Sequence, residues 1–172
     1  MDAINLVRKA RAGDKEALLA LIMLQKQDYY RLAYTYMGND EDAMDAMEDM
    51  IVIIYENIDR IRKPEAFYSW SKTILVNCCR KLLRKKKNLL PLEMAGEESH
   101  EVFPGLDQQM ALESQLSLLH EKHREVLKLR YYLDLDYQQI ADTLKIPLGT
   151  VKSRISTGLM KLSEGLGGEV HE

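Results

Sequence analysis

The sequence has few of the residues that cross-link a chain or break a helix. Its 172 residues include only two cysteines, four prolines and nine glycines. Cys78 and Cys79 are sequence neighbours, which disfavours a disulfide between them and suits a reducing compartment. The four histidines lie outside any C-x-x-C or H-E-x-x-H context, so neither a metal site nor a cofactor is expected.

Long apolar runs are also missing. No stretch approaches the roughly 20 apolar residues that cross a bilayer, and the N-terminal segment alternates charged with apolar positions, unlike a signal peptide. Hydrophobic residues make up 46% of the chain and charged residues 30%, which excludes a disordered tail. We therefore expect a globular cytoplasmic protein without membrane insertion.

The net charge of −3 is unevenly distributed. Residues 1–87 carry 16 Lys and Arg against 13 Asp and Glu, residues 88–107 carry none against five, and residues 108–172 carry eight against nine. The middle stretch also contains two prolines and two glycines, which is typical of a linker. The sequence thus predicts two domains, 1–87 and 108–172, joined by an acidic linker.

Apolar residues on both sides of this linker recur at helical spacing, so the predicted fold class is all-α, with two small helical domains and a flexible linker. Asp14 and Asp40 are the expected N-caps, and Pro64 suits a first helical turn. The expected helices span residues 2–11, 15–37, 41–59, 65–86, 108–119, 121–133, 137–144 and 148–164.

The last two predicted helices have the proportions of a helix-turn-helix, with small Ala141 allowing close packing. At about 100° per residue, the second helix would bury one apolar face formed by Leu148, Val151, Ile155, Leu159 and Leu162. A polar face with basic flanks lies opposite and suits a major groove. Its candidate DNA-binding residues are Thr150, Lys152, Ser153, Arg154, Thr157 and Lys161.

The predicted helix 41–59 combines an apolar stripe with an acidic face that also carries apolar side chains. Such a mixture favours a protein partner over a merely solvated surface. The candidate contact residues are Asp45, Glu48, Asp49, Val52, Tyr55 and Glu56.

The predicted helix 65–86 ends in a basic segment, with six Lys and Arg among residues 80–87. These charges exceed what a helix C-terminus needs and could bind phosphates. Phe67, Trp70, Ile74 and Cys78 are expected on its buried side.

In its length and in the order of these segments along the sequence, the chain resembles the extracytoplasmic-function sigma factors of the sigma-70 family. Asp42-Ala-Met-Asp-Ala-Met-Glu-Asp49 resembles their polymerase-contact segment, and Phe67-Tyr-Ser-Trp70 with Asn77 resembles their minus-ten-recognising helix. Ile146-Pro-Leu-Gly-Thr-Val-Lys-Ser-Arg154 resembles their minus-thirty-five-recognising motif. The sequence departs from the family pattern at Glu48, Ile51 and Lys81.

The resemblance implies a non-enzymatic initiation factor for a stress-responsive or envelope-responsive regulon, acting on the nucleoid. The first domain would bind core RNA polymerase and capture non-template bases of the minus-ten element, and the second would recognise the minus-thirty-five duplex. An anti-sigma partner, often membrane-anchored in this family, is also implied. The implied minus-ten residues are Lys63, Tyr68, Lys72, Thr73, Asn77, Arg80 and Arg84.

Two other hypotheses stay open from the sequence. The first is a stand-alone helix-turn-helix regulator whose N-terminal domain senses a ligand or dimerises. The second is a nuclease or other enzyme, which would need a carboxylate cluster or a Cys/His site that the sequence does not display.

Overall fold

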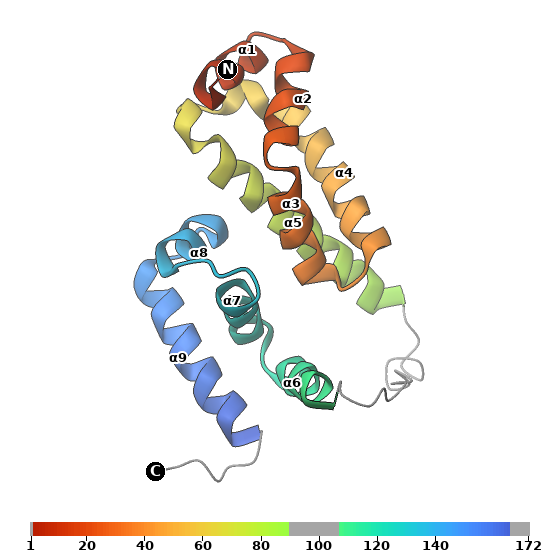
Figure 1. Ribbon diagram of the computed structural model, residues 1–172, viewed down its shortest axis with the longest axis vertical. Helices are drawn as coiled ribbons and strands as arrows, with labels where there is room; N and C mark the ends of the chain where they lie inside the picture. The colour runs from red at the N-terminus through yellow and green to blue at the C-terminus, as the bar shows by residue number, and fades with distance from the viewer. Residues whose placement is uncertain (1, 90–106, 166–172) are drawn as a thin grey trace. The chain divides into compact units, whose positions relative to one another are not determined.

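The computed structural model describes residues 2–89 and 107–165, although not the side chains of residues 107–111. All regular structure within these ranges is helical, which confirms the all-α fold class. The chain divides into two compact units, one built on α1 to α5 and the other on α6, α7, the first part of α8 and α9 (Figure 1).

The first unit consists of five α-helices and two short 3-10 turns, Ile58–Arg60 and Pro64–Ala66. Asp14 caps α2 as expected, accepting hydrogen bonds from the backbone N–H groups of Glu16 and Ala17 at 3.0 and 3.1 Å. The predicted cap at Asp40 is wrong, because Asn39 accepts the bond from the Asp42 N–H instead. The α-helices are α1 (Ala3–Arg11), α2 (Lys15–Leu24), α3 (Lys26–Met37), α4 (Asp40–Asn57) and α5 (Phe67–Leu89).

The expected single helix 15–37 is two helices that follow one another almost end to end (Figure 1). They separate at Gln25, whose backbone leaves the helical region with φ −120° and ψ 28°. On either side of this break, Leu21 of α2 and Tyr29 of α3 are both fully buried. Neither proline nor glycine marks the break, so the sequence pattern could not reveal it.

The buried side of α5 is only partly the expected one, because Phe67 and Cys78 are buried as predicted but two other predicted residues are not. Ser71 and Leu75 are fully buried, whereas Trp70 and Ile74 are half-buried. Burial of Ser71 is possible because its hydroxyl lies 2.7 Å from the hydroxyl of Tyr29, and a hydrogen-bonded pair avoids the cost of an unsatisfied buried polar group. Hydropathy alone does not predict a serine at a core position.

The second unit contains the predicted helix-turn-helix. Ile140 and Val151 are fully buried, and the Ile146 N–H donates to the Ala141 carbonyl across the turn at 3.1 Å. Lys145 makes the turn with a positive φ of 57°. The helices are α6 (Asp107–Leu118), α7 (Glu121–Tyr131), α8 (Tyr137–Leu144) and α9 (Leu148–Gly165).

The apolar face expected on α9 is only partly correct. Val151 and Ile155 are buried, but Leu148 and Leu159 are 37% and 40% exposed. Gly158 lies in the contact with α7 instead, where an added Cβ would stand 3.0 Å from Leu127 Cδ1. The backbone of α9 therefore approaches α7 closely at Gly158. The buried face of α9 is narrower than the spacing of its leucines predicts.

The range expected for the linker, 88–107, overlaps the last residues of α5, which ends at Leu89, and the first residue of α6, Asp107. Residues 90–106 lie outside the described part of the chain. Among the helices that the structure describes, none combines the length and apolar character that a membrane span requires.

Candidate functional site

Three helices carry the residues predicted to meet partners, and α4 presents its set most completely. Ala43, Ala46, Met47, Met50 and Ile54 bury one side of this helix. The six predicted protein-contact residues are all exposed on the other side, within an arc of about 120° by helical geometry. They are Asp45, Glu48, Asp49, Val52, Tyr55 and Glu56, hereafter the α4 docking face.

The apolar part of the α4 docking face is substantial, because Val52 is 54% and Tyr55 51% exposed. Lys15 Nζ lies 5.5 Å from the centroid of the Tyr55 ring, a cation–π distance. A hollow of about 380 Å³ adjoins this ring between the α1–α2 turn and the end of α4. The face thus combines carboxylates, an aromatic side chain and a concavity, as protein interfaces do.

The α5 residues predicted to meet DNA do not all lie together. Thr73, Asn77, Arg80 and Arg84 share one side of the helix, within an arc of about 60°. We call these four residues the α5 polar face. Lys72 lies on another side, and Lys63 precedes the helix in an exposed position.

Tyr68 also lies away from the α5 polar face. Its hydroxyl donates to the Leu21 carbonyl at 3.1 Å, and its ring centroid is 5.2 Å from that of Phe67. Desolvation by burial raises the pKa of Tyr68. These contacts give Tyr68 a part in packing α5 against α2.

Trp70 joins these candidate residues, although its place on the apolar side of α5 predicted a core position. Its ring contacts Phe67, with centroids 6.0 Å apart, yet the residue is only half-buried. By helical spacing it borders the α5 polar face next to Asn77. An accessible aromatic ring beside polar and basic groups can stack on an unpaired base. The signal available in the sequence was a lone tryptophan on a basic helix.

On α9, five of the six predicted DNA contacts share a side away from Val151 and Ile155. Thr150, Ser153, Arg154, Thr157 and Lys161 fall within an arc of about 100°, and we call them the α9 polar face. Lys152 is exposed on the opposite flank, near Leu148 and Leu159.

The contact between α7 and α9 places His123 beneath the α9 polar face. The Nδ1 atom of His123 is buried and has no hydrogen-bond partner among the described residues. Desolvation lowers the pKa of His123, and the nearby charges of Lys161, His120, Arg154 and Lys122 lower it further. The neutral imidazole is therefore the favoured form in the folded unit.

In the described residues, no thiolate and no metal centre accompanies these faces. Burial raises the pKa of the Cys78 thiol to about 11 and that of Cys79 to about 12, so both are protonated at neutral pH. Both thiols are free. Within the described ranges, no three His, Cys, Asp or Glu side chains are grouped to hold a metal ion.

Comparison with known proteins matches both units to one family. Residues 21–89 match the model of sigma-70 region 2, and residues 116–164 match that of sigma-70 region 4. The RNA polymerase sigma factor SigV of Bacillus subtilis is 30% identical over 158 residues, covering 88% of this chain and 92% of the relative. The ECF RNA polymerase sigma factor SigW of the same organism is 28% identical, with 93% and 94% covered.

Solved structures show the same fold. CnrH in complex with the cytosolic domain of CnrY matches with a TM-score of 0.70 at 21% identity, covering 97% of this chain and 98% of that one. The sigma factor RpoE of Bartonella quintana, solved with the anti-sigma factor NepR, matches with a TM-score of 0.62 at 23% identity, covering 86% and 95%.

Proposed function

Because this chain belongs to the extracytoplasmic-function group of sigma-70 RNA polymerase sigma factors, we propose a division of its work among the three faces. The α4 docking face binds core polymerase. The α5 polar face, with Trp70 at its border, captures the non-template strand of the minus-ten element. The α9 polar face recognises the minus-thirty-five duplex, and the domains are residues 1–87 and 108–172.

The observation that carries this proposal is the α4 docking face, where all six predicted residues stand exposed opposite a continuous buried stripe. Carboxylates around Val52 and Tyr55 complement a partner that offers basic and apolar groups together. DNA, a polyanion, would be repelled by the same surface. The face therefore supports a protein partner on α4 and leaves DNA to α5 and α9.

The energy for strand opening would come from capture, without bond making or breaking by this chain. Stacking on Trp70 and hydrogen bonds from Thr73 and Asn77 would offset the cost of unpairing a base. Arg80 and Arg84 would bind the adjoining phosphates. Residues 90–106 of the acidic linker lie outside the described part of the chain, and we propose that the linker enters the RNA channel of the polymerase.

An anti-sigma protein is the second proposed partner. The RpoE match is solved with an anti-sigma factor, and the CnrH match with the cytosolic domain of CnrY. A protein that covered the α4 docking face would block polymerase binding directly. We accordingly place the chain in the cytoplasm, associated with the nucleoid when it is released, and with a stress-responsive or envelope-responsive regulon.

The stand-alone regulator hypothesis is not favoured, since the family match extends over both units. Transcription with purified core polymerase separates the two. The templates are a library of random sequences, and the 5′ ends of the transcripts are sequenced. We expect initiation downstream of a shared pair of minus-thirty-five and minus-ten elements only when the chain is added. Tight, sequence-specific duplex binding by the chain alone, without stimulated initiation, would support the regulator instead.

A further inference from the structure

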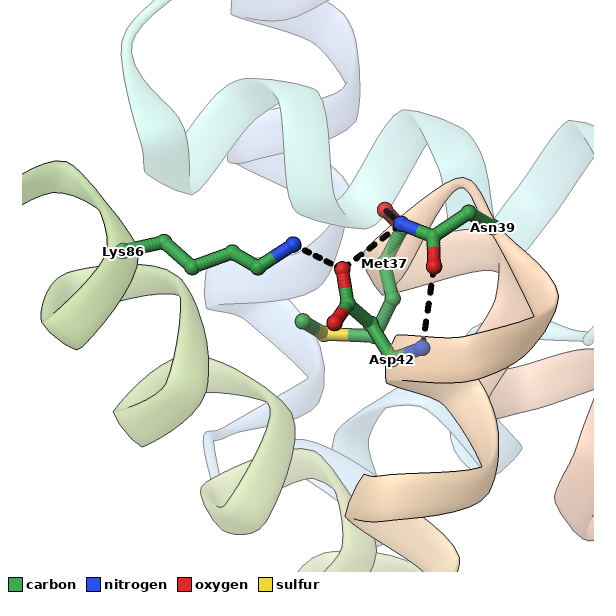
Figure 2. A network of polar contacts seen from close by, with 4 residues as sticks. All are labelled: Met37, Asn39, Asp42 and Lys86. Carbon is green, nitrogen blue, oxygen red and sulfur yellow. Dashed lines mark hydrogen bonds and ion pairs between the residues drawn. The ribbon is translucent and has the colours of Figure 1, made fainter. Parts of the chain in front are cut away.

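One ion pair in the first unit joins the helix that carries the docking face to the helix that carries the α5 polar face. Asp42, in the first turn of α4, contacts the ammonium of Lys86 near the end of α5 (Figure 2). The side chain of Asp42 is 14% exposed and that of Lys86 is 53% exposed. The pair thus bridges residues 44 positions apart in the sequence.

Asn39 holds the carboxylate of Asp42 in place independently of Lys86. Asn39 Nδ2 donates to Asp42 Oδ2 at 2.6 Å, and the Asp42 N–H donates to Asn39 Oδ1 at 2.9 Å (Figure 2). This reciprocal arrangement resembles a capping box. Hydrogen bonds from Lys86 and then Asn39 lower the pKa of Asp42, so the group is ionised at neutral pH. Lys86 therefore meets a preorganised anion.

The end of α5 needs such a contact because apolar burial does not hold it. Every residue from Leu83 to Leu89 is exposed. Six Lys and Arg between residues 80 and 87 repel one another, which opposes a compact helical turn. By helical geometry Lys86 points about 160° away from Arg84. Fixing Lys86 against α4 therefore sets the direction in which Arg84, at the exposed end of α5, points.

We propose that Asp42 is a positioning residue that binds Lys86 and thereby orders the basic end of α5, presenting Arg80 and Arg84 to promoter phosphates. Lys86 is then an internal contact and Asp42 is not part of the docking face, although it stands in the same acidic motif. This inference rests on the proposed function of α5, and it predicts a result opposite in sign to simple electrostatics. Removing an acid should strengthen DNA binding by general charge, whereas removing Asp42 should weaken it.

A double-mutant cycle in the assembled holoenzyme tests the proposal. Asp42→Asn and Lys86→Gln should each weaken the promoter complex about three- to fivefold, the range of a partly exposed ion pair, and the double variant no further. Lys86→Arg should keep the wild-type affinity for the promoter, because it retains a cation that can pair with Asp42. Lys85→Gln is the matched control, since Lys85 is exposed and forms no ion pair or hydrogen bond with the described residues. Its effect should add to that of Asp42→Asn.

Amide hydrogen exchange on the free chain tests the positioning separately from transcription. Exchange in residues 83–89 should accelerate in Asp42→Asn and in Lys86→Gln but stay unchanged in Lys85→Gln. Affinity for core polymerase should be unchanged in all three. Additive effects of Asp42→Asn and Lys86→Gln, or a loss of core affinity in Asp42→Asn, would overturn the proposal. If accelerated exchange came without any transcription by the wild-type chain, the positioning would stand and the proposed function would fail.

Discussion

Helices α4 and α9 are each 18 residues long, and each buries a narrow apolar stripe, yet their exposed sides differ in chemistry. The α4 docking face presents carboxylates around Val52 and Tyr55, whereas the α9 polar face presents hydroxyl groups and cations. Carboxylates with apolar area suit a protein surface, and hydroxyls with cations suit base edges and phosphates. The buried halves thus specify similar helices, and the exposed halves specify different partners.

Reversing charge on the α4 docking face should produce the largest change. We expect Asp45→Lys with Asp49→Lys to lower affinity for core polymerase about a hundredfold or more, because like charges at an interface cost several kcal/mol. Helicity and the midpoint of unfolding should be unchanged, since both side chains are exposed. Affinity is measured by titration with labelled core enzyme.

The matched control is Asp28→Lys with Glu65→Lys, which changes the net charge equally at exposed sites on other elements. It should leave core affinity nearly intact. Equal losses in both double variants would mean that net charge, and not the α4 docking face, governs association.

The same comparison on α9 separates base recognition from phosphate binding. Arg154→Ala should change minus-thirty-five preference by roughly 1–3 kcal/mol at one position, as expected for a lost base contact. Lys161→Gln should weaken binding uniformly and lower the salt slope by about 1, as expected for a lost phosphate contact. Holoenzyme binding to a promoter library at several salt concentrations measures both, and uniform loss in both variants would refute the assignment.

How far the sequence predicts these faces depends on how each helix is packed. The α4 docking face follows from helical period alone, because Ala43, Met47, Met50 and Ile54 form one uninterrupted stripe. The same reasoning overestimates the buried face of α9, since Leu148 and Leu159 remain exposed. There the contact with α7 is made through Gly158, and hydropathy gives no weight to a residue without a side chain.

Other features depend on contacts between distant residues, which a local pattern cannot contain. The buried Ser71 requires the Tyr29 hydroxyl from another helix. Asp42 and Lys86 are 44 positions apart, so their pairing follows only from the packing of α4 and α5. The break at Gln25 has no helix-breaking residue to mark it, and only its backbone angles reveal it.

The close approach of α9 to α7 can be tested by filling it. Gly158→Val should lower the free energy of unfolding of the second unit by about 1–3 kcal/mol, since a Cβ there meets Leu127 Cδ1 at 3.0 Å and His123 Cβ at 3.2 Å. Gly149→Ala is the control on the same helix, where an added Cβ meets no atom within 4 Å. Its gain should be at most about 1 kcal/mol from helix propensity. Urea unfolding followed by far-UV circular dichroism measures both, and equal stability of the two variants would contradict the close packing.

The smallest expected effect concerns the pH response of His123, which distinguishes the two flanks of α9. Burial and neighbouring cations lower the folded-state pKa of His123 below its usual 6.5. The unfolded chain therefore takes up a proton at a higher pH than the folded unit does. The free energy of unfolding of the second unit is therefore highest, as far as His123 is concerned, above about pH 6.5. It decreases as the pH falls toward the folded-state pKa of His123. Lys161→Gln should raise the pKa of His123, because Lys161 is the α9 cation that lowers this pKa most, whereas Lys152→Gln on the opposite flank should leave it unchanged. An NMR titration of the His123 ring in each variant measures this, and an equal response to both substitutions would show that Lys161 does not lie over His123.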